Sequence, residues 1–473
     1  MSNPRNYYDV IIVGARCAGA TLGALLASRG VRTLILDASP LPSDMPMTTH
    51  YMQPPGMDVL DELGVGDSAR ALALPMRQTA MIADQHRLVT PYPEGRAGYC
   101  IRRVSLDTLL QNAAIAAGAE LLDRHRVVEL IHDGERVSGV VVQTPSGQCQ
   151  LRAGLVIGAD GRNSKIAQLT GVEEYLRYNP TRGTYWSYWP VPDAWKAADC
   201  YPQETSIAFE GRGLRCIFPM DHNRMLLVAA PPLEEAERWG RNYRTRYVEY
   251  LKASPTTAPL LEGSDPAGKV MGLLKSQYLY RRAVGPGFAL VGDAGHVKDP
   301  IVGQGMSEAL IGAKHLAAVI LDGRPQAFEW YWRHRDATTA PLFFESIRLG
   351  TVGVNDALFR LIIERCAKSP QLQQRLGMIG DRRVAPQRAC SIPQVSRWLL
   401  GALCRGQFQV LPAYLKIARQ MLGYEREIAV RQQLLEQTLQ SLGAMPQLKP
   451  STRSQTGVRP VEQTQAQSLT ASH

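Results

Sequence analysis

The chain has 473 residues, of which 45% are hydrophobic and 20% are charged. These values lie near the averages of globular proteins and exclude a fibrous or wholly disordered chain, and the length predicts about three structural units. The formal net charge of +10 predicts attraction to phosphates and acidic ligands. Because the basic residues are dispersed and form no recognition motif, we expect no nucleic-acid partner.

The eight cysteines lie at least 14 positions apart, so no CxxC pair exists. This spacing argues against a zinc ribbon, an iron–sulfur cluster or a dithiol motif, and we predict no metal site. No window reaches the length of an apolar membrane span, and the first residues lack the apolar region of a signal peptide. We therefore expect a soluble, cytoplasmic protein.

In chain order, the first predicted feature is a βαβ unit over residues 9–37. Residues 10–13 are all apolar, which is typical of a parallel strand buried on both faces. Residues 14–19 form a tight turn into a helix of small residues. Gly30 ends that helix, and residues 33–37 form the second strand.

The later elements follow from apolar periodicity. We expect helices over 56–64 and 105–118, a strand excursion over 76–98, strands near 126–131, 137–144 and 154–158, an antiparallel sheet over 176–280, a buried strand at 288–292, and a helix from about 305 to 321. Beyond residue 341 the pattern predicts helices, notably over 353–366 and 394–441. Residues 446–473 are rich in Gln, Ser, Thr and Pro, which predicts disorder.

The turn after the first strand is a variant of the GxGxxG phosphate-binding motif, with the sequence Gly14-Ala15-Arg16-Cys17-Ala18-Gly19. Gly14 permits the tight turn and Gly19 permits close packing of helix on strand, whereas Arg16 replaces the middle glycine. Arg16 either crowds a phosphate or neutralises it. Asp37 follows the second strand, where a carboxylate accepts hydrogen bonds from an adenosine ribose. A plain βαβ turn is the alternative.

Two later segments repeat the pattern of a buried strand that ends in glycine and an acid. In the first, Asp160 can accept from a ribose or ribityl hydroxyl and Gly161 permits close backbone approach, although a simple Asx turn is the alternative. In the second, Asp293 is followed by Pro300 and a glycine-rich turn into a helix near residue 305. Such a helix start can stabilise negative charge on a reduced ring. We interpret His296 in this loop as a structural hydrogen-bonding group.

Together, these segments resemble the FAD-dependent monooxygenases of the para-hydroxybenzoate hydroxylase fold, the class A flavoprotein monooxygenases. The resemblance covers about residues 8–340. It rests on Gly14, Gly19 and Asp37, on Arg103-Val-Ser-Leu106-Asp107, on Gly158-Ala-Asp160-Gly161, and on Gly292-Asp293-Ala294 with Pro300 and Gly303-Gln304-Gly305. The Gly-Ala-Arg-Cys-Ala-Gly turn resembles that of a subgroup of these enzymes.

The resemblance implies an α/β fold with a Rossmann-like FAD-binding domain of the GR2 type, an interleaved antiparallel substrate domain and a C-terminal helical extension. The FAD-binding domain would be discontinuous, over residues 1–75, 99–175 and 281–340. The substrate-binding domain would comprise 76–98 and 176–280. A helical region over 341–445 and the tail 446–473 would complete the chain.

The resemblance also implies the cofactor-binding residues, which are Gly14, Ala15, Arg16, Ala18, Gly19, Asp37, Arg103, Asp160, Gly161, Asp293, Gly303, Gly305 and Met306. Pro300, Gly303, Gln304 and Gly305 would border the isoalloxazine ring, and no side chain is assigned as catalytic. The implied reaction uses NAD(P)H and O2, through a flavin C4a-hydroperoxide, to oxygenate an aromatic or lipophilic small molecule, with secondary metabolism as one candidate setting.

Three other functions stay open. A geranylgeranyl-reductase-like double-bond reductase is the main alternative, followed by a flavin-dependent halogenase and a non-catalytic flavoprotein. Reductases and halogenases of this fold tend to carry a Trp-rich motif before a proline. The comparable segment here, residues 213–219, contains no tryptophan, which argues against a halogenase more strongly than against a reductase.

Several features have two interpretations. The aromatics at 185–189 line a substrate pocket or simply pack in the core. His50 is a conceivable, disfavoured point of covalent flavin attachment. The C-terminal helices form a dimer surface, a pocket lid or a basic contact with a membrane surface, against the alternative of an ordinary solvated helix face. Their positive residues include Arg405, Lys416, Arg419, Arg426 and Arg431.

Overall fold

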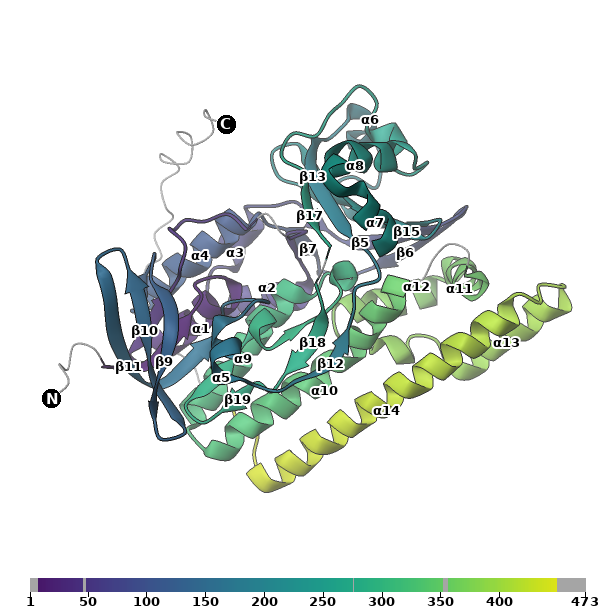
Figure 1. Cartoon of the computed structure of the whole chain (residues 1–473). Coiled ribbons are helices and arrows are strands. Elements are labelled where there is room, and N and C mark those ends of the chain that lie inside the picture. Colours follow the sequence, from purple (N-terminus) through teal and green to yellow (C-terminus); the bar gives the residue numbers. More distant parts are fainter. Residues whose placement is uncertain (1–6, 46–47, 275, 352–355, 449–473) are drawn as a thin grey trace.

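The computed structural model describes residues 7–45, 48–274, 276–351 and 356–448 (Figure 1). Most of the predicted disordered tail, residues 449–473, lies outside the described residues. A large mixed sheet with covering helices, a second sheet above it and a long C-terminal helical region make up the molecule.

The main sheet has eight strands, and its central path runs in the order β19-β20-β11-β1-β2-β8. Strands β20, β11, β1, β2 and β8 are parallel, while β19 and the β9–β10 ribbon pair antiparallel. The bounds are β1 (Tyr7–Val13), β2 (Thr33–Leu36), β8 (Glu120–Leu122), β9 (Arg126–Asp133), β10 (Arg136–Thr144), β11 (Gly147–Gly158), β19 (Val284–Gly285) and β20 (Phe288–Leu290). This order puts the predicted βαβ unit at the centre of the sheet.

Both faces of the main sheet are covered, which explains why the buried stretches of its central strands, such as residues 10–13 and 34–36, are apolar. Helices α1 (Cys17–Ala27), α4 (Arg103–Ala116) and α9 (Gly305–Asp322) pack together on one face. The β9–β10 ribbon and α5 (Lys165–Thr170) close the other face. Helices α2 (Pro54–Glu62) and α3 (Gly66–Arg70) lie beside α9 and α4, respectively.

A seven-stranded sheet has the order β17-β13-β16-β15-β14-β5-β6. Its bounds are β5 (Gln78–Ala83), β6 (His86–Pro91), β13 (Thr184–Pro190), β14 (Glu204–Glu210), β15 (Gly213–Met220), β16 (Arg224–Ala230) and β17 (Met271–Leu273). All neighbours are antiparallel except β5 and β14, which pair in parallel. The expected antiparallel sheet is thus mixed at this one place, because the β5–β6 hairpin comes from far earlier in the chain and joins the sheet edge beside β14.

Short elements connect the two sheets. One three-stranded sheet contains β3 (Tyr51–Met52), β7 (Gly98–Cys100) and β4 (Pro75–Met76), and another contains β12 (Glu174–Tyr178), β18 (Tyr278–Arg281) and β21 (His296–Val297). The remaining short helices are α6 (Asp193–Lys196), η2 (Gly240–Asn242), α7 (Leu233–Trp239), α8 (Tyr243–Lys252), η3 (Ala258–Leu260), η4 (Gly292–Ala294) and η5 (Pro300–Val302). Strands β4, β7, β12 and β18 straddle the predicted domain boundaries, so the chain crosses between units within paired strands.

The C-terminal region differs from expectation in two respects. Its elements are α10 (Pro325–Thr351), α11 (Ala357–Ala367), α12 (Pro370–Gly380), η6 (Pro386–Arg388), α13 (Ile392–Cys404) and α14 (Val410–Leu442). The boundary expected at residue 340 lies inside α10, because this helix continues through Pro341 and has buried residues on both sides of it. The helix expected over 394–441 is two helices, since Gly406 has a φ of 77° and reverses the chain. In Figure 1, α14 runs beside α10 along one side of the molecule.

Candidate active site

Four loops meet at one edge of the main sheet. They follow β1, β2, β11 and β20, which are parallel neighbours, so their carboxyl ends lie side by side. Backbone hydrogen bonds join the loops, from Gly14 to Leu36 at 2.7 Å and from Ala159 to Val13 at 2.8 Å. In open α/β sheets, ligands bind in the crevice outside such strand ends. The three segments predicted from the sequence therefore converge at this edge of the main sheet.

Two glycines of the first turn are required by their surroundings. Gly14 has a φ of 107°, and a Cβ there would lie 2.5 Å from the carbonyl oxygen of Ala159. A Cβ on Gly19 would lie 1.8 Å from the carbonyl oxygen of Gly14. Side chains at either position would fill the cradle between turn and helix. The predicted roles of Gly14 and Gly19 in the turn and in helix packing fit this geometry.

Arg16 stands at the N-cap of α1 and makes no capping hydrogen bond. Its Nη2 lies 3.4 Å from the hydroxyl of Ser43, while its Nη1 is buried with no hydrogen-bond partner. The first N–H groups of α1 are uncapped, and a helix start of this kind attracts anions. A diphosphate would satisfy both the orphaned guanidinium nitrogen and the helix start, so this turn fits a dinucleotide.

Asp37 is buried at the end of β2 and faces the same turn. It accepts hydrogen bonds from the backbone N–H groups of Ala15 at 3.0 Å and Ser39 at 2.9 Å. These contacts fix the carboxylate, and each oxygen keeps a lone pair for a ligand hydroxyl. Asp37 is thus placed as the sequence predicts.

Arg103 begins α4 and is held above the start of α1. It forms a bidentate pair with Asp107 at 2.8–3.1 Å, and Asp107 also accepts from the thiol of Cys17 at 3.4 Å. Burial alone would lower the pKa of Arg103, but Cys17, Asp107 and Asp293 raise it above its usual value. Because the charge of Asp293 acts on Arg103, Asp293, which lies in η4 after β20, is near Arg103. The fixed positive charge of Arg103 therefore stands near the start of α1 and near Asp293, both of which are predicted to contact the cofactor.

Asp160 is used within the protein itself. Its carboxylate accepts from Ser164 Oγ at 2.5 Å and from the backbone N–H groups of Lys165 and Ile166 at 2.6 and 3.1 Å, which caps α5. Burial raises the pKa of Asp160. This is the local turn that the sequence left open as an alternative. Gly161, with a φ of 78° and free space where a Cβ would stand, leaves the backbone accessible.

The loop predicted to border the flavin ring is rigidly built. Asp299 caps η5 by accepting from Ile301 N–H at 2.9 Å, and Gly303, at φ 61°, has Tyr51 only 2.8 Å from where a Cβ would stand. Gln304 is buried and donates to Gln53, while its own Oε1 has no partner. Gln53 donates to the carbonyl of Val302 at 2.7 Å. The orphaned Oε1 of Gln304 is a candidate acceptor for a ligand N–H.

The remaining predicted residues flank this loop. Met306 is buried in the first turn of α9, and Gly305, which begins α9, is exposed with open space around its Cα. Pro300 is exposed at the start of η5. Ala18 is buried in the first turn of α1.

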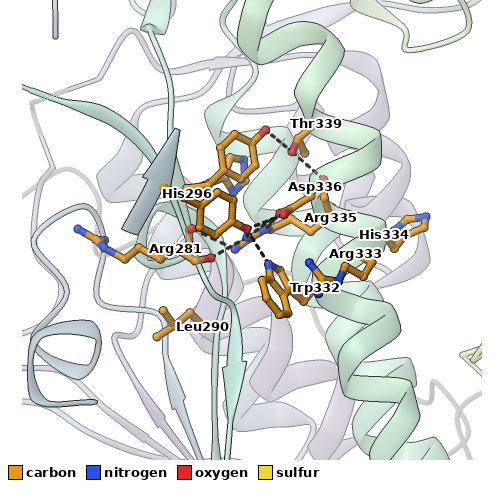
Figure 2. Close-up of polar contacts among 12 residues, drawn as sticks. Arg281, Leu290, His296, Trp332, Arg333, His334, Arg335, Asp336 and Thr339 are labelled. Atoms are coloured by element: carbon orange, nitrogen blue, oxygen red, sulfur yellow. Dashed lines mark hydrogen bonds and ion pairs between the residues drawn. The ribbon is translucent and has the colours of Figure 1, made fainter. Parts of the chain in front are cut away.

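A buried ionic network that the sequence analysis missed positions the loop after β20 (Figure 2). Arg335 of α10 donates to the carbonyls of Gly295 at 3.0 Å and Arg281 at 2.7 Å, and pairs with Asp336 at 2.6 Å. Arg281 donates in turn to the carbonyl of Ala294 at 3.0 Å. These contacts hold the backbone on either side of η4. They involve residues on separate elements, so packing alone brings them together.

The C-terminal region also reaches this loop, which the sequence did not indicate. Glu308 of α9 accepts from His296 at 3.0 Å and pairs with Lys298 and with Arg382, which follows α12. Burial would raise the pKa of Glu308, but the positive charges of Lys298 and Arg382 hold it well below its usual value. The carbonyl of Gly380 accepts from Gln304 at 3.3 Å. His296 thus makes the structural hydrogen bond expected of it.

An aromatic and apolar wall, formed by the seven-stranded sheet together with β3, β4 and β7, lies beside the loop, where Tyr51 adjoins Gly303. Tyr51 of β3 contacts Phe218 of β15, with ring centroids 5.6 Å apart. The buried members of this wall are Tyr51, Met76, Cys100, Trp186, Cys216, Phe218, Met220, Leu226 and Val228. Trp189 and Tyr185 of β13 instead pack on the opposite face, with Tyr247 and Trp239. The two faces of the strand therefore pack into two different apolar clusters, and a substrate pocket lined by these aromatics stays a prediction.

His50 and Tyr188 form a buried pair beside this wall. His50 Nδ1 accepts from the backbone N–H of Arg103 at 3.3 Å, so its proton lies on Nε2 and is donated to the Tyr188 hydroxyl at 2.6 Å. Burial, then the charges of Arg103 and Arg102, lowers the pKa of His50 to about 3, so the ring is neutral. Both ring nitrogens are engaged, and covalent attachment of a flavin would break one of these contacts.

This edge of the sheet, with its glycine cradle, uncapped helix start and fixed arginine, is typical of a dinucleotide-binding α/β fold. The family model described as "FAD binding domain" matches residues 7–341. The chain therefore belongs to this family and is an FAD-dependent oxidoreductase. Among the described residues, no group of three or more His, Cys, Asp or Glu side chains is arranged to hold a metal ion.

Relatives in the family carry out different reactions. The chain is 27% identical over 347 residues to digeranylgeranylglycerophospholipid reductase 2 of Methanothermobacter thermautotrophicus, covering 69% of this chain and 84% of the relative. It is 26% identical over 402 residues to the ubiquinone hydroxylase UbiL of Rhodospirillum rubrum, covering 80% of this chain and 87% of the relative. Similarity therefore extends over most of the length of both relatives.

Solved structures show the same fold. A flavin-dependent brominase matches with a TM-score of 0.69 and 16% identity, covering 85% of this chain and all of that chain. The p-nitrophenol 4-monooxygenase of Pseudomonas putida matches with a TM-score of 0.66 and 17% identity, covering 80% of this chain and 98% of that chain. At these identities the likeness shows the fold alone.

Proposed function

We propose that the protein is an NAD(P)H-dependent monooxygenase of the class A type that transfers one oxygen atom from O2 to an aromatic or lipophilic small molecule. The observation that carries this proposal is the apolar wall of the seven-stranded sheet directly beside the loop at residues 300–305. Residues 76–98 and 176–280 would form the substrate-binding unit. Oxygen transfer needs a dry, uncharged pocket that holds substrate against the cofactor.

The described residues fit FAD. The turn at residues 14–19, Asp37 and Arg103 would hold the ADP half, and Asp293 with residues 303–306 would hold the flavin half. When bound, FAD supplies two-electron transfer from NAD(P)H and reaction with O2. The chain's own task is then to bind substrate, orient it and exclude water.

The wall would be electrically neutral during turnover. Burial raises the pKa of Cys216 to about 12, and burial followed by nearby Asp221 raises that of Cys100. Burial raises the pKa of Tyr51 above its usual value. Neither thiol therefore offers a thiolate nucleophile at neutral pH.

Tyr188 is the polar group best placed to orient a substrate. Burial raises its pKa to about 12, so the hydroxyl stays protonated. Because His50 donates to this oxygen, the proton of Tyr188 itself is available to a substrate oxygen. We assign Tyr188 a positioning role at the rim of the wall.

A double-bond reductase is the second candidate, favoured by the similarity to digeranylgeranylglycerophospholipid reductases. The same apolar wall would hold a prenyl chain. Strand β15 presents Cys216 and Phe218, and no tryptophan, to the wall, which supports oxygen transfer over reduction or halogenation.

The deciding experiment uses the FAD-loaded protein with NADH or NADPH and a panel of phenols, quinones, polyketides and isoprenoids. We expect NAD(P)H oxidation that depends on substrate, and a product that is one oxygen atom heavier and carries label from isotopically labelled O2. A product two hydrogens heavier, formed equally well without O2, would establish the reductase instead. A product that contains halogen only when halide is added would establish a halogenase.

A further inference from the structure

Helices α13 and α14 form a hairpin at the edge of the molecule, with its turn far from the main sheet (Figure 1). The inner side of the hairpin is packed. Leu399, Ala402 and Val410 are buried against Leu358 and Leu361 of α11. The hairpin is therefore a fixed part of the fold, and its outer side presents a defined surface.

The hairpin exposes large apolar side chains on both of its helices and in its turn. Six of the eleven exposed large hydrophobic residues in the described chain lie within residues 392–424, namely Ile392, Leu400, Phe408, Leu411, Leu415 and Leu422. Ile392 is 76% exposed and Phe408, in the turn, is 69% exposed. Contiguous exposed apolar residues mark interaction surfaces in folded proteins.

The charge of the same segment has one sign. Residues 392–424 contain Arg397, Arg405, Lys416 and Arg419, all exposed, and no aspartate or glutamate. The second half of α14 differs, because Glu425, Glu427 and Glu436 alternate there with basic residues. Residues 392–424 therefore carry an excess of exposed positive charge that the second half of α14 lacks.

The apolar and basic residues of α14 are ordered around the helix. At 100° per residue, Leu411, Leu415 and Leu422 lie within about 40° of one another, and Arg419 lies about 40° beyond Leu415. Lys416 lies about 100° beyond Leu415. Long basic side chains at the edge of an apolar stripe can extend their charged ends to a polar boundary while their stems cover apolar groups.

We propose that the outer side of the α13–α14 hairpin docks on an anionic lipid surface. The leucines and Phe408 would enter the boundary between headgroups and acyl chains, and the flanking basic residues would contact lipid phosphates. The contact is superficial, since no helix in the described part of the chain is long and apolar enough to cross a membrane. The proposal is independent of the reaction that the enzyme catalyses.

The pattern favours lipid over a second copy of the chain. In a twofold contact the same surface meets itself, so four basic residues would face four basic residues with no acid between them. An anionic surface supplies the opposite charge together with an apolar interior. It therefore satisfies both features of the hairpin at once.

The hairpin is also connected to the candidate active site. Trp398 of α13 and Cys390 belong to the apolar cluster that contains Ile301 and Val302 of the ring-bordering loop. A lipid-bound hairpin would thus hold that loop near the membrane. This arrangement suits a substrate that partitions into lipid.

The test is flotation of the full-length protein with vesicles of phosphatidylcholine alone, or of phosphatidylcholine with about one-third phosphatidylglycerol. We expect binding only to the anionic vesicles, weakened by salt. The variant Arg405→Gln/Lys416→Gln/Arg419→Gln should bind about fivefold more weakly for each charge removed. The variant Leu411→Ser/Leu415→Ser/Leu422→Ser should lose binding while it keeps its FAD content.

The matched control is Ile115→Ser/Leu321→Ser, which removes exposed apolar side chains from α4 and α9, outside the hairpin. It should bind anionic vesicles as the unmodified protein does. Equal binding by the hairpin variants, or no flotation of the unmodified protein, would overturn the proposal. Dimerisation that the leucine variant abolishes, without vesicle binding, would identify a second copy as the partner.

Discussion

Asp37 and Asp160 are both acids placed directly after a strand of the main sheet, and local sequence does not separate their roles. Asp37 accepts two backbone N–H groups and still faces the glycine turn. Asp160 uses its carboxylate on Ser164 and the first N–H groups of α5. The difference depends on the next element of the chain, because α5 begins five residues after Asp160, whereas the next helix after Asp37 in the described chain is α2, which begins at Pro54.

His50 gives a prediction at the same scale. Its pKa is about 3 in the folded protein and about 6.5 in the unfolded chain, so between these values only the unfolded chain binds the proton. The stability that neutral His50 contributes is complete above pH 6.5 and is lost as the pH falls toward 3. Between pH 4 and 6, His50→Gln should reduce the slope of unfolding free energy against pH by about 1.4 kcal/mol per unit.

Urea unfolding at a series of pH values measures this slope. His132→Gln, at an exposed position in β9, is the control and should leave the slope unchanged. A slope that is the same in His50→Gln and in the unmodified protein would show that His50 is protonated without cost in the fold.

At the scale of elements, α9 and α12 are joined by the buried carboxylate of Glu308. Glu308→Gln would leave Lys298 and Arg382 without their acid, and we expect a loss of about 3–5 kcal/mol in unfolding free energy. Burial, opposed by the charge of Glu308, lowers the pKa of Lys298 to about 8. The loss should therefore be larger at pH 6, where the lysine is charged, than at pH 9.

Thermal or urea unfolding at both pH values tests this difference. Lys314→Gln, also on α9, breaks the more exposed pair with Glu62 of α2 and should cost less than about 1 kcal/mol. Equal costs for the two variants would mean that the link between α9 and α12 is no stronger than a surface ion pair.

The two faces of β13 give a second prediction for elements. Trp189→Phe removes the hydrogen bond from Nε1 to Tyr247 at 2.9 Å, and should cost about 1–2 kcal/mol of stability without a change in KM. Trp186→Phe alters the wall beside the loop at residues 300–305 and should raise KM about tenfold. Steady-state kinetics and unfolding curves of both variants decide the matter. A KM effect from Trp189→Phe alone would place the substrate on the other face of the sheet.

At the scale of the whole molecule, the cofactor should stabilise four loops at once. Removal of FAD should lower the unfolding free energy by about 4 kcal/mol, relative to protein in a solution whose free FAD concentration is about 1,000 times the dissociation constant of FAD. FMN should restore little of this stability, because it lacks the ADP half that the Gly14 turn and Asp37 would bind. Thermal unfolding of apoprotein with each nucleotide measures the effect. Equal stabilisation by FMN would move the binding site away from the Gly14 turn.

Local patterns in the amino-acid chain were enough to predict the βαβ unit, the acids at the strand ends and the glycines of the cradle. These features have local causes: apolar strands buried on both faces, a φ of 107° at Gly14, and a required close approach at Gly19. Such constraints act between residues close in sequence, or through a strand pattern that one topology satisfies. They can therefore be recognised before any contact is known.

The remaining features arise from packing between distant segments. The Arg335 network, the contact of Arg382 with Glu308 and the two faces of β13 join residues far apart in the chain. A buried ion pair leaves no periodic signal, because each partner looks like an ordinary polar residue until packing removes it from water. The division of the last helices at Gly406 was missed for a related reason, since a single left-handed residue interrupts an otherwise continuous helical pattern.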